Sequence, residues 1–336
     1  MEAEAELVQI GDYKIGKALP ACRSELAYEG THIVLPRRAR LTVMHPRFTG
    51  VRPVAVRIVR EACILEAISH PGVPRVFECG VIDRRPWIAT ELVCEPTLGD
   101  ELAERALSVS AVITLLRDAA EVLAAAHRRG VVHRALTPDA IQRTPNRSFP
   151  ICMTGWGDAA VGEGALPQFV ADDARHYRAP ELARGGAELA DGRADVYALG
   201  AIAHEALTLA LPIVSVPRYM GIPAEISRLL ERMLAPDPVA RPSAAEVRAE
   251  AMRMAELGDA VDQVDVELVD ISHADPDPAA WESSAPRPTV VGMAPISPVT
   301  PVTPLAPPRV RWTPSPGVDR TPVETPLAAF EISRRH

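Results

Sequence analysis

The chain has 336 residues, enough for about two domains' worth of hydrophobic core. Hydrophobic residues make up 47% and charged residues 24%, which excludes a wholly disordered chain. The formal net charge of −8 argues against a broad basic surface for nucleic acid. The sequence has no apolar run of about 18 to 20 residues, an acidic start unlike a signal peptide, and no C-x-x-C among its five cysteines. We therefore expect a cytoplasmic protein without disulfides or a metal site, which binds neither nucleic acid nor a membrane.

Residues 13–92 have the pattern of a strand-rich region that contains one helix. Apolar side chains three and four residues apart predict that helix over residues 54–69, ended by Pro71 and Gly72. Short apolar runs bounded by turn residues predict strands on both sides of it. The expected strands cover residues 13–19, 26–28, 32–35, 39–44, 75–79 and 87–92.

The region after Pro96 changes to helical periodicity. Ser110 is the expected N-cap of a long helix, and Gly130 follows it at the left-handed position. Ser243 and Glu246 form a capping-box pattern at the start of the last helix. The expected helices cover residues 110–129, 196–208, 224–234 and 243–257. Strands followed by helices predict an α+β protein.

Residues 258–336 are rich in proline, serine and threonine, and 14 of the 33 prolines lie in residues 274–336. So few large apolar side chains cannot offset the entropy lost on ordering, which predicts a disordered tail. Seven Ser-Pro or Thr-Pro steps in the tail are candidate phospho-acceptors, namely Ser297, Thr300, Thr303, Thr313, Ser315, Thr321 and Thr325. An inert, proline-rich spacer is the alternative interpretation of the same composition.

Four segments together resemble the eukaryotic-like Ser/Thr protein kinase family in its bacterial form. They are VVHRALTPDAI at 131–141, YRAPEL at 177–182, DGRADVYALG at 191–200 and APDPVARPSAAEV at 235–247. Any one of them is a weak signal, but four in the family's order and spacing are specific. The resemblance covers residues 12–257 and implies a bilobal kinase-like fold, with a β-rich N-lobe over 12–93 and a mainly helical C-lobe over 97–257. Residues 1–11 are then an N-terminal extension.

The resemblance assigns structural roles to five residues. His133 and Arg134 match the start of the family's catalytic loop, and Asp195 matches the helix-start acid that anchors that loop. Glu181 and Arg241 match two residues that form a buried ion pair in the family. Because leaving one half of a buried pair is strongly destabilising, their presence indicates that the fold is maintained.

The residues that carry out phosphoryl transfer in the family are absent at the matching positions. The reaction needs a glycine-rich backbone and a lysine at the phosphates, groups that hold Mg²⁺, and an acid that orients the attacking hydroxyl. Residues 18–26 contain no glycine, and no lysine follows Lys17. The strand lysine, the base, the loop lysine, the Mg²⁺ amide and the metal acid are replaced, in that order, by Thr42, Ala135, Thr137, Ala140 and Gly155. We therefore expect no catalytic residue and no ATP or Mg²⁺ cofactor.

The resemblance also implies which side chains line the cleft between the lobes, namely Arg40, Glu61, Thr90 and Glu91. Arg40 shares a strand face with Thr42, and we expect it to fill the nucleotide cleft. Glu61 matches the helix glutamate that normally pairs with the strand lysine. Without that lysine, it either pairs with Arg40 or is a solvated helix acid.

Two features offer a partial replacement of the lost chemistry. Lys14 and Lys17, on the first strand, are an alternative source of the phosphate-binding lysine. Asp139 and Asp158 are carboxylates near the altered catalytic positions. We interpret Asp139 and Asp158 as solvated loop acids, since neither occupies a liganding position.

These observations predict a pseudokinase that acts as a signalling scaffold or a regulator of a protein partner. The partner is expected to be an active kinase or a module that recognises phosphorylated or polyproline segments. Residues 158–176 contain no Ser, Thr or Tyr, so phosphorylation within that stretch cannot activate the domain. A divergent kinase with residual ATP binding and phosphotransfer is one alternative, and a purely structural protein is another.

Overall fold

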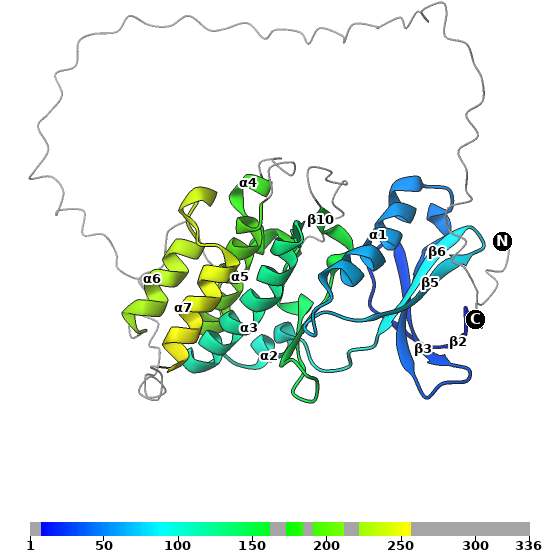
Figure 1. The fold of residues 1–336 in the computed structure, drawn as a ribbon, viewed down its shortest axis with the longest axis horizontal. Helices are drawn as coiled ribbons and strands as arrows, with labels where there is room; N and C mark the ends of the chain where they lie inside the picture. Colours follow the sequence, from blue (N-terminus) through cyan, green and yellow to red (C-terminus); the bar gives the residue numbers. More distant parts are fainter. Residues whose placement is uncertain (1–7, 162–172, 184–190, 212–221, 257–336) are drawn as a thin grey trace, which may run out of the picture. The chain divides into compact units, whose positions relative to one another are not determined.

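The computed structural model describes residues 8–161, 173–183, 191–211 and 222–256. Within these residues, a six-stranded antiparallel sheet precedes a mainly helical part (Figure 1). This arrangement confirms the expected α+β, two-lobed fold. The expected tail, residues 258–336, and all its Ser-Pro and Thr-Pro steps lie outside the described residues.

The N-lobe sheet has the strand order β1-β2-β3-β4-β6-β5. Its strands are β1 (Gln9–Ile10), β2 (Tyr13–Leu19), β3 (Glu25–His32), β4 (Arg38–Met44), β5 (Val76–Ile82) and β6 (Arg85–Glu91). Side chains alternate along β4 between the two faces of the sheet. Leu41 and Val43 pack with Trp87 in an apolar cluster on one face. Arg40 and Thr42 point to the opposite face, where both line a cleft, in agreement with the expected shared face.

The sheet begins before residue 12, inside the segment assigned to an N-terminal extension. Gln9 lies opposite Lys14, and Ile10 lies opposite Tyr13, in the β1–β2 pairing. Ile10 is completely buried and Tyr13 is nearly so, which makes β1 part of the apolar cluster of the sheet. Lys14 is exposed to solvent.

The strand expected at residues 32–35 is wrong. β3 ends at His32, and Ile33, Val34 and Leu35 form a turn in which they are 47%, 80% and 44% exposed. The His32 ring holds this turn, because its Nδ1 accepts hydrogen bonds from the backbone N–H groups of Val34 and Leu35 at 3.1 and 3.0 Å. An apolar run usually indicates burial, so the sequence pattern favours a strand where the chain turns.

Helix α1 (Arg52–Ile68) packs against β4, β5 and β6 (Figure 1). It begins two residues before the expected helix, with Pro53 in its first turn, where a missing N–H group breaks no hydrogen bond. The buried side chains Val54, Ile58 and Leu65 join it to the main apolar core. This packing fixes α1 relative to β4.

The helical part is organised around α3 (Val109–Arg128), whose Leu115, Leu116 and Leu123 are fully buried. Helix α3 packs against α5 and α7 (Figure 1). Gly130 follows α3 with a φ of 69°, the expected left-handed position. The other helices are α2 (Leu98–Glu104), α4 (Pro180–Ala183), α5 (Arg193–Thr208), α6 (Ala224–Met233) and α7 (Ala244–Glu256).

One expected helix cap is present and another lies elsewhere. In the capping box of α7, Ser243 Oγ accepts from Glu246 N at 3.3 Å, and the Glu246 carboxylate accepts from Ser243 N at 2.7 Å. The N-cap of α3 is Ser108 rather than Ser110, since Ser108 Oγ accepts from Ala111 N at 3.2 Å. Both serines are favourable N-cap residues, so the sequence alone does not distinguish them. In the structure the helix begins at Val109, which makes Ser108 the cap.

Short elements connect the sheet to the helices. They are β7 (Val131–Val132), β8 (Ile141–Arg143), β9 (Ile151–Met153), β10 (Ala160–Val161) and the 3₁₀ turns η1 (Pro46–Phe48), η2 (Pro138–Ala140), η3 (Trp156–Asp158), η4 (Asp173–Tyr177) and η6 (Pro238–Ala240). Strand β7 pairs with β10, and β8 pairs with β9. The connecting segments that carry the altered catalytic positions therefore lie side by side. Among the described helices, none is long and apolar enough to span a membrane.

Candidate functional site

A cleft of about 730 Å³ lies between the N-lobe sheet and the helical part. Its walls come from β3, β4, β6 and α1, from the segment after β6 and from the segment around η3. The structure brings six of the expected positions together there: Arg40, Thr42, Glu61, Thr90, Glu91 and Gly155. The volume is within the range of small-molecule sites, so the cleft is open.

Arg40 lines this cleft and does not fill it, which corrects the expectation from the sequence. Its Nη2 donates to the carbonyl oxygen of Pro20 at 2.5 Å, so the side chain runs toward the loop between β2 and β3. Burial lowers the pKa of Arg40, and the charges of Glu61 and Glu25 act in the opposite direction. Strand parity gives the face of a long side chain but not the direction that it takes along that face.

The loop between β2 and β3 is also tied to two other elements. Arg47 of η1 donates to the carbonyl oxygen of Arg23, and Arg57 of α1 donates to Cys22 Sγ at 3.0 Å. In a catalytic kinase, the corresponding backbone presents its N–H groups to the phosphates. Here the loop instead supplies acceptors to guanidinium groups of the chain itself.

Arg57 is the centre of a nearly buried ion-pair cluster. Its Nη1 donates to Glu25 of β3, and its Nε and Nη2 donate to the two carboxylate oxygens of Asp158 at 3.2 and 3.3 Å. The three side chains are between 9% and 11% exposed. Burial alone would lower the pKa of Arg57, but the charges of Glu25 and Asp158 outweigh it and raise that pKa. The cluster therefore joins β3, α1 and η3.

The structure corrects the expectation for Asp158 and decides against an Arg40–Glu61 ion pair. Asp158 is not a solvated loop acid, because it is 10% exposed and paired with Arg57. Arg40 and Glu61 are both within the described residues and form no ion pair with each other. Asp139, in contrast, is exposed, and its carboxylate accepts from the hydroxyl of Thr97 at 3.4 Å.

Glu61 is partly buried in the cleft wall and has an unusual acidity. Burial raises the pKa of Glu61 to about 7, with a further contribution from the like charge of Glu25. The charges of Arg57 and Arg40 act in the opposite direction, and Asp158 adds to the increase. A substantial fraction of Glu61 is therefore protonated at neutral pH.

Replacing Glu61 with glutamine is expected to stabilise the domain by about 1 to 2 kcal/mol at pH 8. A carboxyl with a raised folded-state pKa holds its proton more tightly when folded, so the native chain loses stability as the pH rises from about 4.5 to about 7. Solvent in the cleft keeps the effect below the full value of the shift. Urea unfolding at about pH 4, 6 and 8 measures it, with Glu66→Gln, an exposed acid on the same helix, as the control. If the difference in unfolding free energy between Glu61→Gln and the native chain did not change with pH, the raised pKa of Glu61 would not be its cause.

Asp195, in the first turn of α5, holds the backbone of the loop after β7. Its Oδ2 accepts from His133 N at 2.8 Å, and its Oδ1 accepts from Arg134 N at 2.7 Å. His127 Nε2 lies 2.9 Å from Oδ2. Burial alone would raise the pKa of Asp195, but the hydrogen bond and charge of His127, the charge of His133 and the Arg134 backbone donor together lower it. Arg134 has a left-handed φ of 66°, which these contacts hold in place.

Glu181 and Arg241 form a bidentate ion pair at distances of 2.7 and 2.9 Å. The Arg241 side chain is completely buried, whereas that of Glu181 is 20% exposed. Arg241 also donates to the carbonyl oxygen of Ala235 at 2.7 Å and lies 4.8 Å from the ring centre of Tyr197. The pair therefore connects α4, α5 and the segment before α7.

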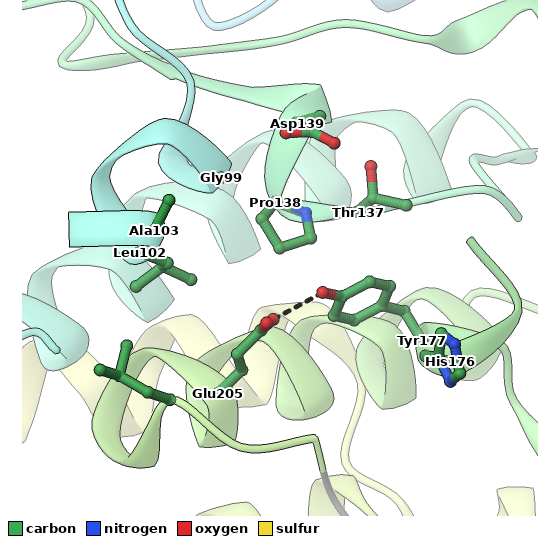
Figure 2. A pocket seen from close by; sticks show the side chains of 10 residues that line it. Gly99, Leu102, Ala103, Thr137, Pro138, Asp139, His176, Tyr177 and Glu205 are labelled. Carbon is green, nitrogen blue, oxygen red and sulfur yellow. Dashed lines mark hydrogen bonds between the residues drawn. The ribbon is translucent and has the colours of Figure 1, made fainter. Parts of the chain in front are cut away.

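Three of the altered catalytic positions lie outside the lining of the cleft. Ala135 is half-buried and Ala140 is buried. Thr137 lines a second pocket of about 340 Å³, in which Tyr177 donates from its hydroxyl to Glu205 at 2.6 Å (Figure 2). Alanine at two of these positions leaves no group there that takes up a proton or binds a metal ion.

The sequence reasoning missed Arg57 and Glu25. Arg57 lies one helical turn before Glu61, so both project from the same side of α1. Glu25 follows the loop in which glycines are expected, and its charge there is opposite to that of Arg57. The signal that points to this cluster is an acidic residue, Glu25, beside the expected phosphate loop together with a basic residue, Arg57, on the helix.

Four features together define a protein kinase fold. They are the six-stranded sheet with one helix, the helical lobe, the loop anchored by Asp195 and the Glu181–Arg241 pair. The family model described as "Protein kinase domain" matches residues 49–252. The chain therefore belongs to the protein kinase domain family. The curated relatives that it matches include bacterial serine/threonine-protein kinases.

Two curated relatives and one solved structure illustrate this similarity. The chain is 31% identical over 220 residues to serine/threonine-protein kinase Pkn1 of Myxococcus xanthus, covering 63% of this chain and 31% of Pkn1. It is 29% identical over 197 residues to PknL of Mycobacterium tuberculosis, covering 58% and 49% of the two chains. The crystal structure of the Mycobacterium tuberculosis PknI kinase domain has a TM-score of 0.58 and 25% identity, and the match covers 75% of this chain and 99% of that one. The matched region thus spans less than half of the length of each of these two curated relatives.

Proposed function

We propose that the domain is a catalytically inactive protein kinase, a pseudokinase, and that it acts as a signalling scaffold or a regulator of a protein partner. The observation that carries this proposal is the composition of the cleft. Thr42 and Gly155 stand where the family has its lysine and metal acid, and Arg57 is already paired with two carboxylates. Phosphoryl transfer depends on free cations and a metal at the phosphates. A missing general base alone reduces the rate by about 10² to 10⁴.

The purified chain is expected to transfer no phosphate from radiolabelled ATP and Mg²⁺ to itself or to casein. Label that appears in independent preparations and disappears in Asp139→Asn would overturn the proposal. Asp139 is the exposed carboxylate closest in sequence to the altered base position, so it is the acid to test. Asp83→Asn, in the exposed β5–β6 turn, is the matched control, and its activity should equal that of the native chain.

One observation favours the alternative of a divergent kinase that binds ATP, namely the open volume of the cleft. Thermal unfolding with millimolar ATP separates the two functions. A ligand at 100 times its dissociation constant stabilises the folded state by about 2.7 kcal/mol, which is a readily measured shift. The pseudokinase proposal expects no shift, with or without Mg²⁺.

The proposed partner is a protein, either an active kinase or a module that binds phosphorylated or polyproline segments, in the cytoplasm. The intact anchoring contacts of Asp195 and Arg241 support a domain that is retained for its surface. Affinity purification of the full chain, compared with a chain truncated after Glu256, assigns the partner to the domain or to residues 257–336. Neither membrane nor nucleic acid is part of the proposal.

A further inference from the structure

Carboxylates outnumber cations around the inter-lobe cleft. In the described part of the chain, two arginines line it, Arg40 and Arg57. The acids that line it are Glu25, Glu29, Glu61, Glu91, Glu95, Asp100 and Asp139. A concave surface with this excess of negative charge repels a polyphosphate and attracts a cation.

Six of these seven acids already have partners within the chain. Glu95 accepts from the backbone N–H of Cys94, and Asp139 accepts from the hydroxyl of Thr97. Glu25 pairs with Arg57, Glu29 with Arg38 and Glu91 with Arg147. Asp100 belongs to the capping box at the start of α2. Their carboxylates are thus engaged in holding the walls of the cleft.

Glu61 differs from these acids. It lines the cleft from α1 and forms no hydrogen bond or ion pair with another residue that the structure describes. The charged groups that face it are Arg57 of its own helix, Glu25 of β3, Arg40 of β4 and Asp158 of η3. Because Arg57 is shared by two other carboxylates and Arg40 donates to a backbone carbonyl, both cations are directed elsewhere.

Apolar side chains line the same cleft as Glu61. Leu65 is one helical turn further along α1, and Ile88 of β6 and Trp156 of η3 also line the cleft. A ligand with an apolar body and one positive charge would bury its body against these walls while the charge meets Glu61. A ligand with phosphate groups would bring further negative charge into an acidic site.

We propose that the cleft is a binding site for a small organic cation, an amine or amidine on an apolar body, with Glu61 as its counter-ion. The inference rests on the proposed function in one respect only, namely that the cleft does not bind Mg·ATP. It deepens that function, because a ligand of this class would control the domain without any transfer of phosphate.

Titration calorimetry of the full chain with benzamidine and with its neutral analogue benzamide tests the proposal. Benzamidine is expected to bind at least about tenfold more tightly, the effect of one partly desolvated ion pair. Glu61→Gln should reduce its affinity to that of benzamide. Glu66→Gln, an exposed acid on the same helix outside the cleft, should leave it unchanged. Thermal unfolding of each variant verifies that it is folded.

The pH dependence supplies a second readout that is specific to Glu61. Benzamidine keeps its charge over the range tested, whereas Glu61, with a pKa of about 7, loses its proton between about pH 6 and 8. The affinity of the native chain should therefore rise across this interval, and that of Glu61→Gln should stay constant.

Equal affinities for benzamidine and benzamide would overturn the proposal, as would unchanged binding by Glu61→Gln. Displacement of benzamidine by Mg·ATP would also overturn it, because the cleft would then accept a polyphosphate. The radiolabel assay judges the proposed function separately. Phosphate transfer without benzamidine binding would contradict both the pseudokinase and the cation site. If the chain neither transfers phosphate nor binds benzamidine, only the cation site is contradicted.

Discussion

Replacing Arg241 with methionine is expected to lower the free energy of unfolding by about 4 kcal/mol. The substitution leaves the Glu181 carboxylate without its bidentate partner and removes the donor to the Ala235 carbonyl oxygen. A buried acceptor that loses its donor bears the full desolvation penalty. Urea unfolding followed by far-UV circular dichroism measures the loss. Glu181→Gln, which keeps a polar side chain beside Arg241, should destabilise by about half as much.

The control for this prediction is Arg228→Met on α6. Arg228 also pairs with a glutamate, Glu225, at 3.3 Å, but the two side chains are 68% and 60% exposed. Exposed pairs contribute about 0 to 1 kcal/mol, so the control should unfold almost like the native chain. If Arg241→Met yields no soluble protein, Glu181→Gln gives the measurement. Equal effects of Arg228→Met and Glu181→Gln would contradict a special role for the buried pair.

Much of the framework could be predicted from the sequence, because its residues act through fixed backbone positions. Asp195 binds two consecutive N–H groups of the loop after β7, a contact that depends only on residue type and place in the chain. The Glu181–Arg241 pair likewise follows from two residues in the segments that resemble the kinase family. The fold class follows from the same segments, since they appear in the family's order.

The chemistry of the cleft walls was harder to predict. Arg57 and Asp158 are 101 residues apart, and no local pattern indicates that they meet. The sequence predicts a solvated Asp158 because this residue occupies no liganding position, whereas in the structure it pairs with Arg57 of the other lobe. For Arg40, strand alternation gave the correct face, but the backbone carbonyl of Pro20 determines where its guanidinium ends. Partners of long charged side chains depend on tertiary packing, which the sequence does not contain locally.

Replacing Arg57 with methionine is expected to lower the free energy of unfolding by about 3 kcal/mol at neutral pH. The change leaves Glu25 and Asp158, both nearly buried, without the arginine that they share as an ion-pair partner, and the two carboxylates then repel each other. It also releases the loop contact at Cys22 Sγ, so hydrogen exchange in residues 20–25 and in α1 should become faster. Arg38→Met is the control, because Arg38 is 59% exposed where it pairs with Glu29.

The double variant Arg57→Met/Glu25→Gln distinguishes electrostatics from lost packing. Removing one of the two repelling carboxylates should restore part of the stability that Arg57→Met loses at neutral pH. Urea unfolding of the single and double variants measures this recovery. A deficit that Glu25→Gln leaves unchanged would mean that Arg57 acts by filling space rather than through its charge.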